Sequence, residues 1–163
     1  MEGSTDILSS RAALERVTCW LLVERLENWL RDSQDGFRQF GLPEHKEKLG
    51  RSLEKGDLLF FYVSSGQSKF ADVREVTDAG VTKLRLGGDY DLPFPWCVRT
   101  RPVLTLARES WVPIKPLIGE LSFTRGKADW RQVMRNSLRR LDVGDAARLM
   151  SILRGRFMQS LSR

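Results

Sequence analysis

The side chains that most often catalyse reactions or hold metals are few in this sequence. It has one histidine, His45, and two cysteines, Cys19 and Cys97, which lie 78 positions apart with no CxxC pair. Zinc sites need closely spaced Cys and His ligands, so we expect no metal site. GxxxxGK[ST], GxGxxG and GxSxG motifs are also missing, and no cofactor is expected. A Cys19 nucleophile with His45 as base is conceivable, but a thiol inside an apolar segment is usually inert. We therefore expect no enzymatic activity.

Basic side chains concentrate at the C-terminal end of the sequence. Residues 1–124 hold 17 Lys or Arg and 18 Asp or Glu, whereas residues 125–163 hold 10 and 3. The net charge of +6 therefore comes from the C-terminal segment. Clustered Arg attracts phosphate backbones without sequence preference, although a solvated helix face has the same composition. Charge alone thus favours nucleic acid only weakly.

Length and composition favour one globular domain. The 163 residues, 41% apolar and 29% charged, suffice to bury a core without metal or disulfides. No apolar run reaches the roughly 20 residues that cross a bilayer, and residues 1–17 lack the apolar core of a signal peptide. We therefore expect a cytoplasmic protein without membrane contact. Cys19 and Cys97 are expected to be buried thiols in preference to a disulfide.

Strand patterns dominate the first two thirds of the sequence. The predicted strands span residues 18–24, 58–63, 70–76, 96–106 and, more weakly, 81–86. Residues 58–63 are apolar nearly throughout, which is typical of a strand buried on both faces. With the turn at 64–67 and the strand that follows, they form a predicted hairpin. Pro102 predicts an edge position or a bulge in the last strand.

Helical patterns occur near the start and at the end. Residues 27–35 predict a short helix ending near Gly36, and residues 37–49 follow as an irregular stretch. Apolar residues recur at helical spacing at Trp130, Val133, Met134, Leu138 and Leu141, with Arg131, Arg135 and Arg139 on the opposite side. A further helix is predicted to start at Asp145, as its cap, and to run to Gly155. This order predicts an α+β fold: a β-barrel of about five to six strands, flanked by helices, with a helical C-terminus.

Several segments resemble, in the same order, the motifs of EVE domains. They are CWLLVERLENW (residues 19–29), FGLPEHKEKLGRSLEKGD (40–57), LLFFYVSSGQSKFADVREVT (58–77), LPFPWCVRTRPVL (92–104), VPIKPLIGELSF (112–123) and WRQVMRNSLRRL (130–141). The likeness covers residues 18–153, and its several collinear motifs make it more specific than any one string. The sequence departs from it at Phe40, where many relatives have Trp, and at Cys19, where an aromatic is usual.

This resemblance implies a PUA-like fold, related to the YTH domains that bind methylated adenine, as one domain over residues 18–163. Residues 1–17 lie outside it, as a disordered arm or an added helix. Some family members are joined to restriction endonucleases that recognise modified cytosines in DNA. The implied function is therefore non-catalytic binding of a modified base, such as 5-methylcytosine or 5-hydroxymethylcytosine, flipped into an aromatic pocket.

The resemblance also implies which residues form that pocket. Phe40, Phe94 and Trp96 lie in loops or at strand starts and are expected as walls that stack on the base. The remaining pocket residues are expected to be Arg25, Asn28, Trp29, His45, Ser64 and Ser65. Arg131, Arg135 and Arg139 would then contact phosphates. Structural roles are the alternatives: Asn28 as a helix cap and Ser64 as a turn residue.

Three alternatives stay open. DNA is favoured over RNA by a small margin, so a module that binds modified RNA is the first. A protein-interaction or adaptor module, whose basic helices dock a protein, is the second. The third is an enzyme acting on modified nucleosides, which a carboxylate, Cys19 or His45 in the pocket would favour. An endonuclease or another effector is a further partner that the resemblance implies.

Overall fold

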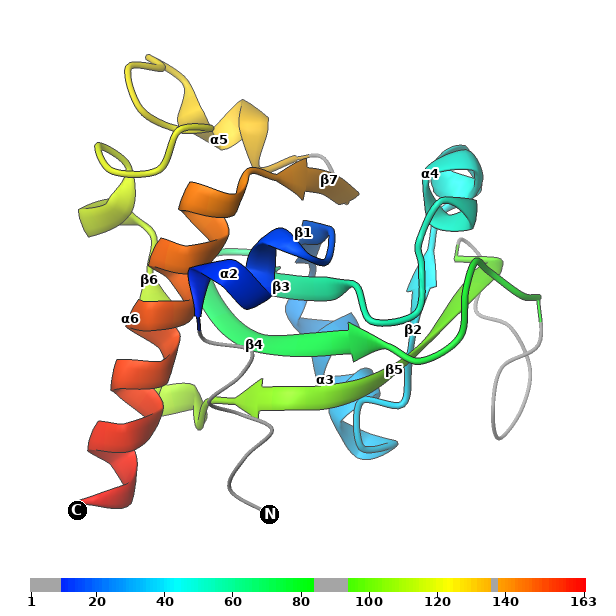
Figure 1. Cartoon of the computed structure of the whole chain (residues 1–163), viewed down its shortest axis with the longest axis horizontal. Coiled ribbons are helices and arrows are strands. Elements are labelled where there is room, and N and C mark those ends of the chain that lie inside the picture. Colours follow the sequence, from blue (N-terminus) through cyan, green and yellow to red (C-terminus); the bar gives the residue numbers. More distant parts are fainter. Residues whose placement is uncertain (1–9, 84–93, 136–137) are drawn as a thin grey trace.

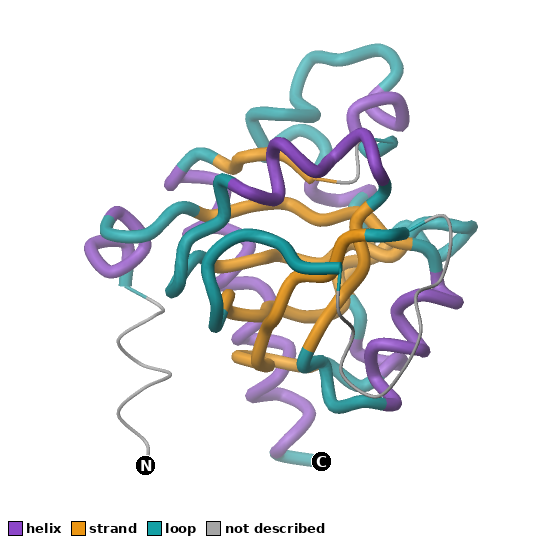
Figure 2. Tube along the Cα trace, turned by 90° about the vertical axis from the view of Figure 1, so that its right-hand side faces the viewer, coloured by secondary structure: helices purple, strands orange, loops and turns teal. Residues whose placement is uncertain are grey.

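Seven strands of the computed structural model form one curled sheet (Figure 1, Figure 2). The structure describes residues 10–83, 94–135 and 138–163. The strands are β1 (Cys19–Glu24), β2 (Gln39–Leu42), β3 (Leu58–Val63), β4 (Lys69–Val76), β5 (Trp96–Thr105), β6 (Val112–Pro113) and β7 (Leu138–Leu141). Their order is β2-β5-β4-β3-β1-β7, and β6 pairs with β4 outside this path. Of the pairings among these strands, β1 with β3 is parallel and the others are antiparallel.

Helices pack around the sheet. The long helix α6 (Val143–Leu161) runs beside β5 and β6, and α2 (Arg11–Glu15) packs against it (Figure 1). The helix α3 (Leu26–Gln34) follows β1 directly and lies beside β2. The shorter helices are α4 (Glu47–Arg51), α5 (Trp130–Val133) and the 3-10 turns η1 (Glu44–Lys46), η2 (Arg108–Ser110) and η3 (Lys115–Leu117). Within the described ranges, none of the helices combines the length and apolar character needed to cross a membrane.

The two faces of the sheet enter two separate hydrophobic cores. Along β3, Phe60 and Tyr62 belong to the core that contains α6, whereas Leu59 and Phe61 belong to the core that contains β2. Successive side chains of a strand point to opposite faces, so a strand covered on both sides needs apolar residues throughout. All six residues of β3 are buried. This confirms the two-sided burial that the apolar run predicted.

The predicted α+β class is confirmed, and four of the predicted strands correspond to β1, β3, β4 and β5. The predicted irregularity at Pro102 is a bulge: the pairing of β4 with β5 shifts between Val73 and Arg74, which oppose Leu104 and Pro102. Proline has no N–H to donate to a neighbouring strand, which favours such a shift. In the segment 81–86, for which the sequence predicts a strand more weakly, Thr82 forms an isolated β-bridge with Cys97. Residues 84–86 lie outside the described residues.

The helix expected over residues 130–141 is wrong. The helix α5 ends at Val133, and the chain then forms β7, antiparallel to β1. Cys19 pairs with Leu141 and Leu22 with Leu138. Without β7 the buried strand β1 would leave a row of backbone groups unpaired, and this requirement outweighs the helical spacing of the apolar residues. Residues 136 and 137 lie outside the described residues.

The C-terminal helix differs from its predicted limits. It begins at Val143 and continues to Leu161, so Gly155 lies within it. Its N-cap is Asp142, whose Oδ1 accepts a hydrogen bond from the backbone N of Asp145 at 2.7 Å. This bond lowers the pKa of the Asp142 carboxyl. Asp145 itself accepts from the backbone N of Ser122 at 2.9 Å, and so it holds the preceding segment to the helix.

Two segments without a predicted regular structure contain short elements. Residues 37–49 were expected to be irregular, yet they include β2, η1 and the start of α4. The strand β2 extends the sheet beyond β5, because Gln39 pairs with Arg99 and Leu42 with Trp96. In the N-terminal extension, residues 11–15 form α2, and Leu14 is buried in the core that contains α6. Residues 1–9 lie outside the described residues.

Candidate functional site

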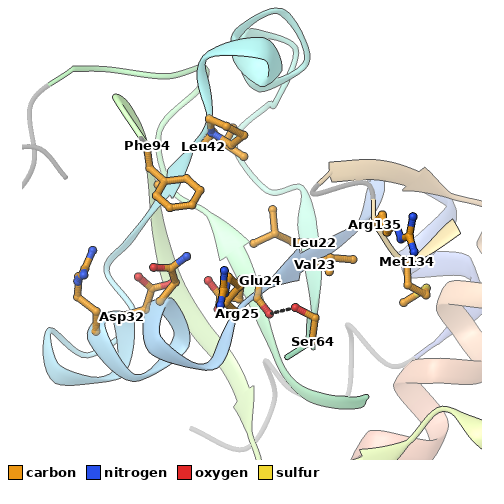
Figure 3. A pocket seen from close by; sticks show the side chains of 14 residues that line it. Leu22, Val23, Glu24, Arg25, Asp32, Leu42, Ser64, Phe94, Met134 and Arg135 are labelled. Atoms are coloured by element: carbon orange, nitrogen blue, oxygen red, sulfur yellow. Dashed lines mark hydrogen bonds between the residues drawn. The ribbon is translucent and has the colours of Figure 1, made fainter. Parts of the chain in front are cut away.

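A cavity of about 320 Å³ lies where the carboxyl ends of β1 and β3 meet the start of α3 (Figure 3). It is lined by Leu22, Val23, Glu24, Arg25, Asn28, Arg31, Asp32, Gly41, Leu42, Pro43, Ser64, Phe94, Met134 and Arg135. Because β1 and β3 are parallel neighbours, with Glu24 opposite Val63, both strands end at the same edge of the sheet. The segments that follow them therefore meet at the cavity. In Figure 3 the Phe94 ring projects between Leu42 and the side chains of α3.

Five of the residues predicted from the sequence line this cavity: Arg25, Asn28, Ser64, Phe94 and Arg135. Arg25 is the N-cap of α3 and Asn28 lies in the first turn, so Asn28 does not cap the helix. Ser64 donates two hydrogen bonds to the carbonyl of Glu24, from its backbone N at 2.8 Å and from its hydroxyl at 3.2 Å. These bonds fix the end of β3 to the end of β1 beside the cavity.

Three aromatic residues assigned to the pocket from the sequence are core residues instead. Phe40 is fully buried and meets Phe61 edge-on, with 5.4 Å between ring centroids. The Nε1 of Trp29 donates to Asp72 Oδ1 at 2.8 Å, inside the core that contains α6. Trp96 is buried in the other core, and its Nε1 has no hydrogen-bond partner among the described residues. None of the three lines the cavity.

The other predicted residues lie at the surface. His45 is exposed in η1, and Ser65 is exposed at φ 56°, which a tight turn requires. Arg131 and Arg139 contact the rings of Trp130 and Phe123 at 4.8 and 5.5 Å. Because they belong to α5 and β7, they do not share one helix face with Arg135. Only Arg135 of the three lines the cavity.

Behind the cavity lies a charged network that the sequence interpretation missed. Arg74 of β4 is fully buried, and three carboxyl groups surround it. Its guanidinium nitrogens lie 2.6 Å from Asp72 Oδ2, 2.8 Å from Asp32 Oδ2 and 3.1 Å from Glu24 Oε1. The guanidinium also lies 3.4 Å from the ring centroid of Phe61. Buried charges persist only when they are paired and hydrogen-bonded, so this network joins β1, α3 and β4.

Burial shifts the titration of the two carboxyls that line the cavity. It raises the pKa of Glu24 well above its usual value, and the nearby Asp32 raises it further, whereas Arg74 opposes the shift. Burial likewise raises the pKa of Asp32 to about 6, against the opposing effect of Arg74. A hydrogen bond joins the two side chains, favouring a protonated Glu24 and an ionised Asp32. Of the two carboxyls, Glu24 is therefore the one that holds a proton more readily.

A weak sequence signal for this network existed. Asp72 and Arg74 are charged residues two positions apart within β4, and both therefore lie on one face of the strand. Asp32 lies four residues after Asn28, on the same side of α3. Neither spacing indicates that the two segments meet, because α3 and β4 come together only in the folded sheet.

The alternative catalytic groups do not meet in the cavity. Neither Cys19 nor His45 lines it, and burial together with the charge of Asp57 raises the pKa of the Cys19 thiol to about 11. In the part of the chain that the structure describes, no cluster of His, Cys, Asp or Glu is arranged to hold a metal ion. Two carboxyls, Glu24 and Asp32, do line the cavity.

The shifted carboxyls predict an unusual pH dependence of stability. Burial raises the pKa of Asp32 in the folded chain to about 6, so the contribution of this group to stability is complete below its unfolded-state pKa and is lost as pH rises through 6. We expect Asp32→Asn, which imitates the protonated acid, to become more stable relative to the wild type between pH 4.5 and 7.5. Urea unfolding at pH 4.5, 6 and 7.5 measures this difference.

Asp78→Asn, at an exposed position after β4, is the control for removal of one negative charge. A difference between Asp32→Asn and the wild type that stays constant across this pH range would contradict the raised pKa. The comparison between variants cancels the contributions of titrating groups that lie far from Asp32, and the remaining difference reports Asp32 together with its partner Glu24.

The curled mixed sheet with flanking helices is the half-barrel of PUA-like and YTH proteins. The structure is similar to that of YTH domain-containing protein mmi1 with RNA, with a TM-score of 0.63 and 9% identity over 90% of this chain and 87% of that chain. It is also similar to the YTH domain of Zygosaccharomyces rouxii MRB1 protein in complex with N6-methyladenosine RNA, with a TM-score of 0.61 and 9% identity over 85% and 88%. At such identities the likeness shows the fold alone.

The sequence defines the family more closely. The sequence model of the EVE domain family matches residues 18–152, and the chain therefore belongs to that family. A UPF0310 protein of Pyrococcus abyssi is 26% identical over 146 residues, which cover 82% of this chain and 98% of that protein. The resemblance found in the sequence motifs is thereby confirmed.

Proposed function

We propose that this chain is a non-catalytic module that binds nucleic acid carrying a modified base, with the base flipped into the cavity beside α3. The observation that carries the proposal is the combination of the Phe94 ring with hydrogen-bonding groups from Asn28 and Ser64 in one cavity. Extruding a base costs a few kcal/mol, and stacking on an aromatic ring recovers about 1–3 kcal/mol. The residue set therefore suits a ligand that is flat, polar at its edges and attached to a phosphate backbone.

Basic side chains at the mouth of the cavity support a nucleic acid as the partner. Arg25 and Arg135 are exposed and line the cavity, as does Arg31 on the exposed side of α3. Arg131 and Arg139 belong to the same basic segment of the sequence as Arg135, and we propose them as further phosphate contacts outside the cavity lining. Positive side chains at the entrance and an aromatic ring inside allow the backbone and the base to be held by different groups.

We propose 5-methylcytosine or 5-hydroxymethylcytosine in DNA as the base, with an endonuclease or another effector as a further partner. The proposal takes residues 18–163 as one EVE domain, preceded by an extension that includes α2. It also places the protein in the cytoplasm, where the buried thiols Cys19 and Cys97 stay reduced. Modified RNA is the second candidate, because the YTH domain of MRB1, which has a similar fold, forms a complex with N6-methyladenosine RNA.

An enzyme acting on modified nucleosides is the remaining alternative, and the two carboxyls in the cavity favour it. Carboxyls with shifted pKa values in a cavity are frequent in active sites. Here, however, Arg74 contacts one oxygen of each carboxyl and ties both side chains to the buried network, which is a structural role. Incubation with modified oligonucleotides followed by mass spectrometry tests for turnover, and we expect the substrate to be unchanged.

Phe94→Ala tests the proposed function directly. Loss of the stacking ring is expected to weaken binding of a duplex with one central 5-methylcytosine by about 5- to 150-fold, which corresponds to 1–3 kcal/mol. Binding of the unmodified duplex, which depends on phosphate contacts, should change by less than about twofold. Fluorescence anisotropy at two salt concentrations measures both affinities.

Leu30→Ala, at an exposed position of α3 outside the cavity lining, is the matched control. Equal affinity of the wild-type chain for modified and plain cytosine in DNA, and for N6-methyladenosine and adenosine in RNA, would overturn the proposal. The two nucleic acids are tested at the same ionic strength, because phosphate contacts depend strongly on salt.

A further inference from the structure

The inner wall of the cavity is rich in hydrogen-bond acceptors. Glu24, at the end of β1, and Asp32, in α3, both line the cavity although their side chains are only 9% and 5% exposed. Figure 3 shows that these side chains lie across the cavity from Leu42, with Phe94 beside them. We call the side chains of Glu24 and Asp32 the carboxyl pair. A flipped base that enters past the Phe94 ring would meet the carboxyl pair with its edge.

The charges around the carboxyl pair leave it net negative. Asp72 and Arg74 of β4 face it from behind, and Asp72 and Arg74 together contribute no net charge. The guanidinium N–H groups of Arg74 are directed at Asp72, Asp32 and Glu24, so they serve the network and not a ligand. Because a carboxyl group has at most one donor and several lone pairs, the carboxyl pair offers more acceptors than donors.

The remaining charged groups lie at the mouth. Arg25 and Arg31 of the helix α3 and Arg135 after α5 line the cavity from its rim. A phosphate is attracted to these arginines and repelled by the carboxyl pair, so the electrostatic pattern favours entry of the base with the phosphate outside. The inner edge of that base must donate hydrogen bonds, since an acceptor placed against acceptors is left unpaired.

We propose that the carboxyl pair Glu24–Asp32 selects bases whose inserted edge carries an exocyclic amino group, as cytosine and adenine do, over bases that present a carbonyl there, as thymine and uracil do. This inference rests on the proposed function and names its specificity-determining residues. The amino N–H donates to the Asp32 carboxylate. The ring nitrogen beside it accepts a hydrogen bond from the Asn28 amide, because the Glu24 proton is already donated to Asp32.

The test compares two oligonucleotides that differ at the proposed contact alone. 5-Methylcytosine and thymine share the pyrimidine ring and the 5-methyl group. 5-Methylcytosine carries a 4-amino group and an N3 without hydrogen, whereas thymine carries a 4-carbonyl group and an N3–H. Single strands are used so that neither base has to leave a pair. The wild-type chain should bind the 5-methylcytosine strand at least about tenfold more tightly, as one correctly paired base edge allows.

Two variants separate the roles of the carboxyl pair. Glu24→Gln imitates the protonated acid and keeps the Asp32 carboxylate, so the ratio of the two affinities should stay within about twofold of the wild type. Asp32→Asn replaces the acceptor with an amide that can also donate, and the ratio should fall close to one. Thermal unfolding and binding of an unmodified duplex show that both variants are folded.

The outcomes distinguish this inference from the function on which it rests. Tighter binding of 5-methylcytosine than of cytosine, together with equal affinity for 5-methylcytosine and thymine, would overturn the inference and leave the proposed function standing. A ratio that is unchanged in Asp32→Asn would also overturn it. Failure to distinguish any modified base from its plain form, in DNA or RNA, would overturn both. For RNA, adenosine and inosine provide the equivalent comparison of amino and carbonyl edges.

Discussion

Arg74→Met is expected to lower the free energy of unfolding by about 3–5 kcal/mol, because removal of one partner from a buried charge network leaves the others uncompensated. Arg74 is fully buried, and its loss would leave Glu24, Asp32 and Asp72 without their cation. Methionine preserves much of the volume against the ring of Phe61, so the effect reports charge more than packing. Urea unfolding at pH 7 measures it.

Arg101→Met is the matched control on the neighbouring strand. Arg101 of β5 pairs with Glu75, the residue after Arg74 on β4, but the Arg101 side chain is 57% exposed. Exposed ion pairs contribute about 0–1 kcal/mol, so this variant should remain near wild-type stability. Similar losses for the two variants would contradict the role assigned to the buried network.

Phe40→Ala is expected to lower the free energy of unfolding by about 3–5 kcal/mol through the cavity that it leaves in the core. Phe40 of β2 is fully buried, and its ring lies edge-on to the ring of Phe61 in β3. Phe94→Ala, at a half-buried position in the cavity wall, should cost less than about 1.5 kcal/mol, because only part of its ring is removed from water. Chemical denaturation measures both variants.

The two phenylalanines should thus have opposite phenotypes. Phe94→Ala should weaken base recognition with little loss of stability, whereas Phe40→Ala should weaken stability first. Discrimination between modified and plain bases by Phe40→Ala, under conditions where it remains folded, should match the wild type. Direct loss of discrimination in a folded Phe40→Ala protein would show that Phe40 belongs to the base site.

The main strands were predictable because burial on one or both faces leaves a clear apolar pattern. The run at β3 and its return in β4 identify the hairpin from local sequence alone. The strands β2 and β7 were not predictable, since four residues such as Leu138–Leu141 carry no periodicity of their own. They become strands because β5 and β1 present edges that need partners, which is information from distant parts of the chain.

The candidate site was predictable only where its residues follow a strand end. Arg25, Asn28 and Ser64 line the cavity because each lies just beyond β1 or β3, at the edge where these parallel strands terminate. Aromatic character misled the prediction for Phe40 and Trp96, since a ring that suits a cleft suits a core equally well. Glu24 and Asp32 were missed because their common partner, Arg74, comes from another strand.

The position of β1 has a consequence for how the chain assembles. It pairs on one side with β3 and on the other with β7, so Cys19 lies opposite Leu141, the last residue of β7. During synthesis, β1 must therefore wait for more than a hundred further residues before its second edge is covered. Non-local pairings of this kind slow folding and expose apolar strands to aggregation. The early part of the chain thus depends on its late part, and truncations before β7 would leave the sheet open beside the cavity.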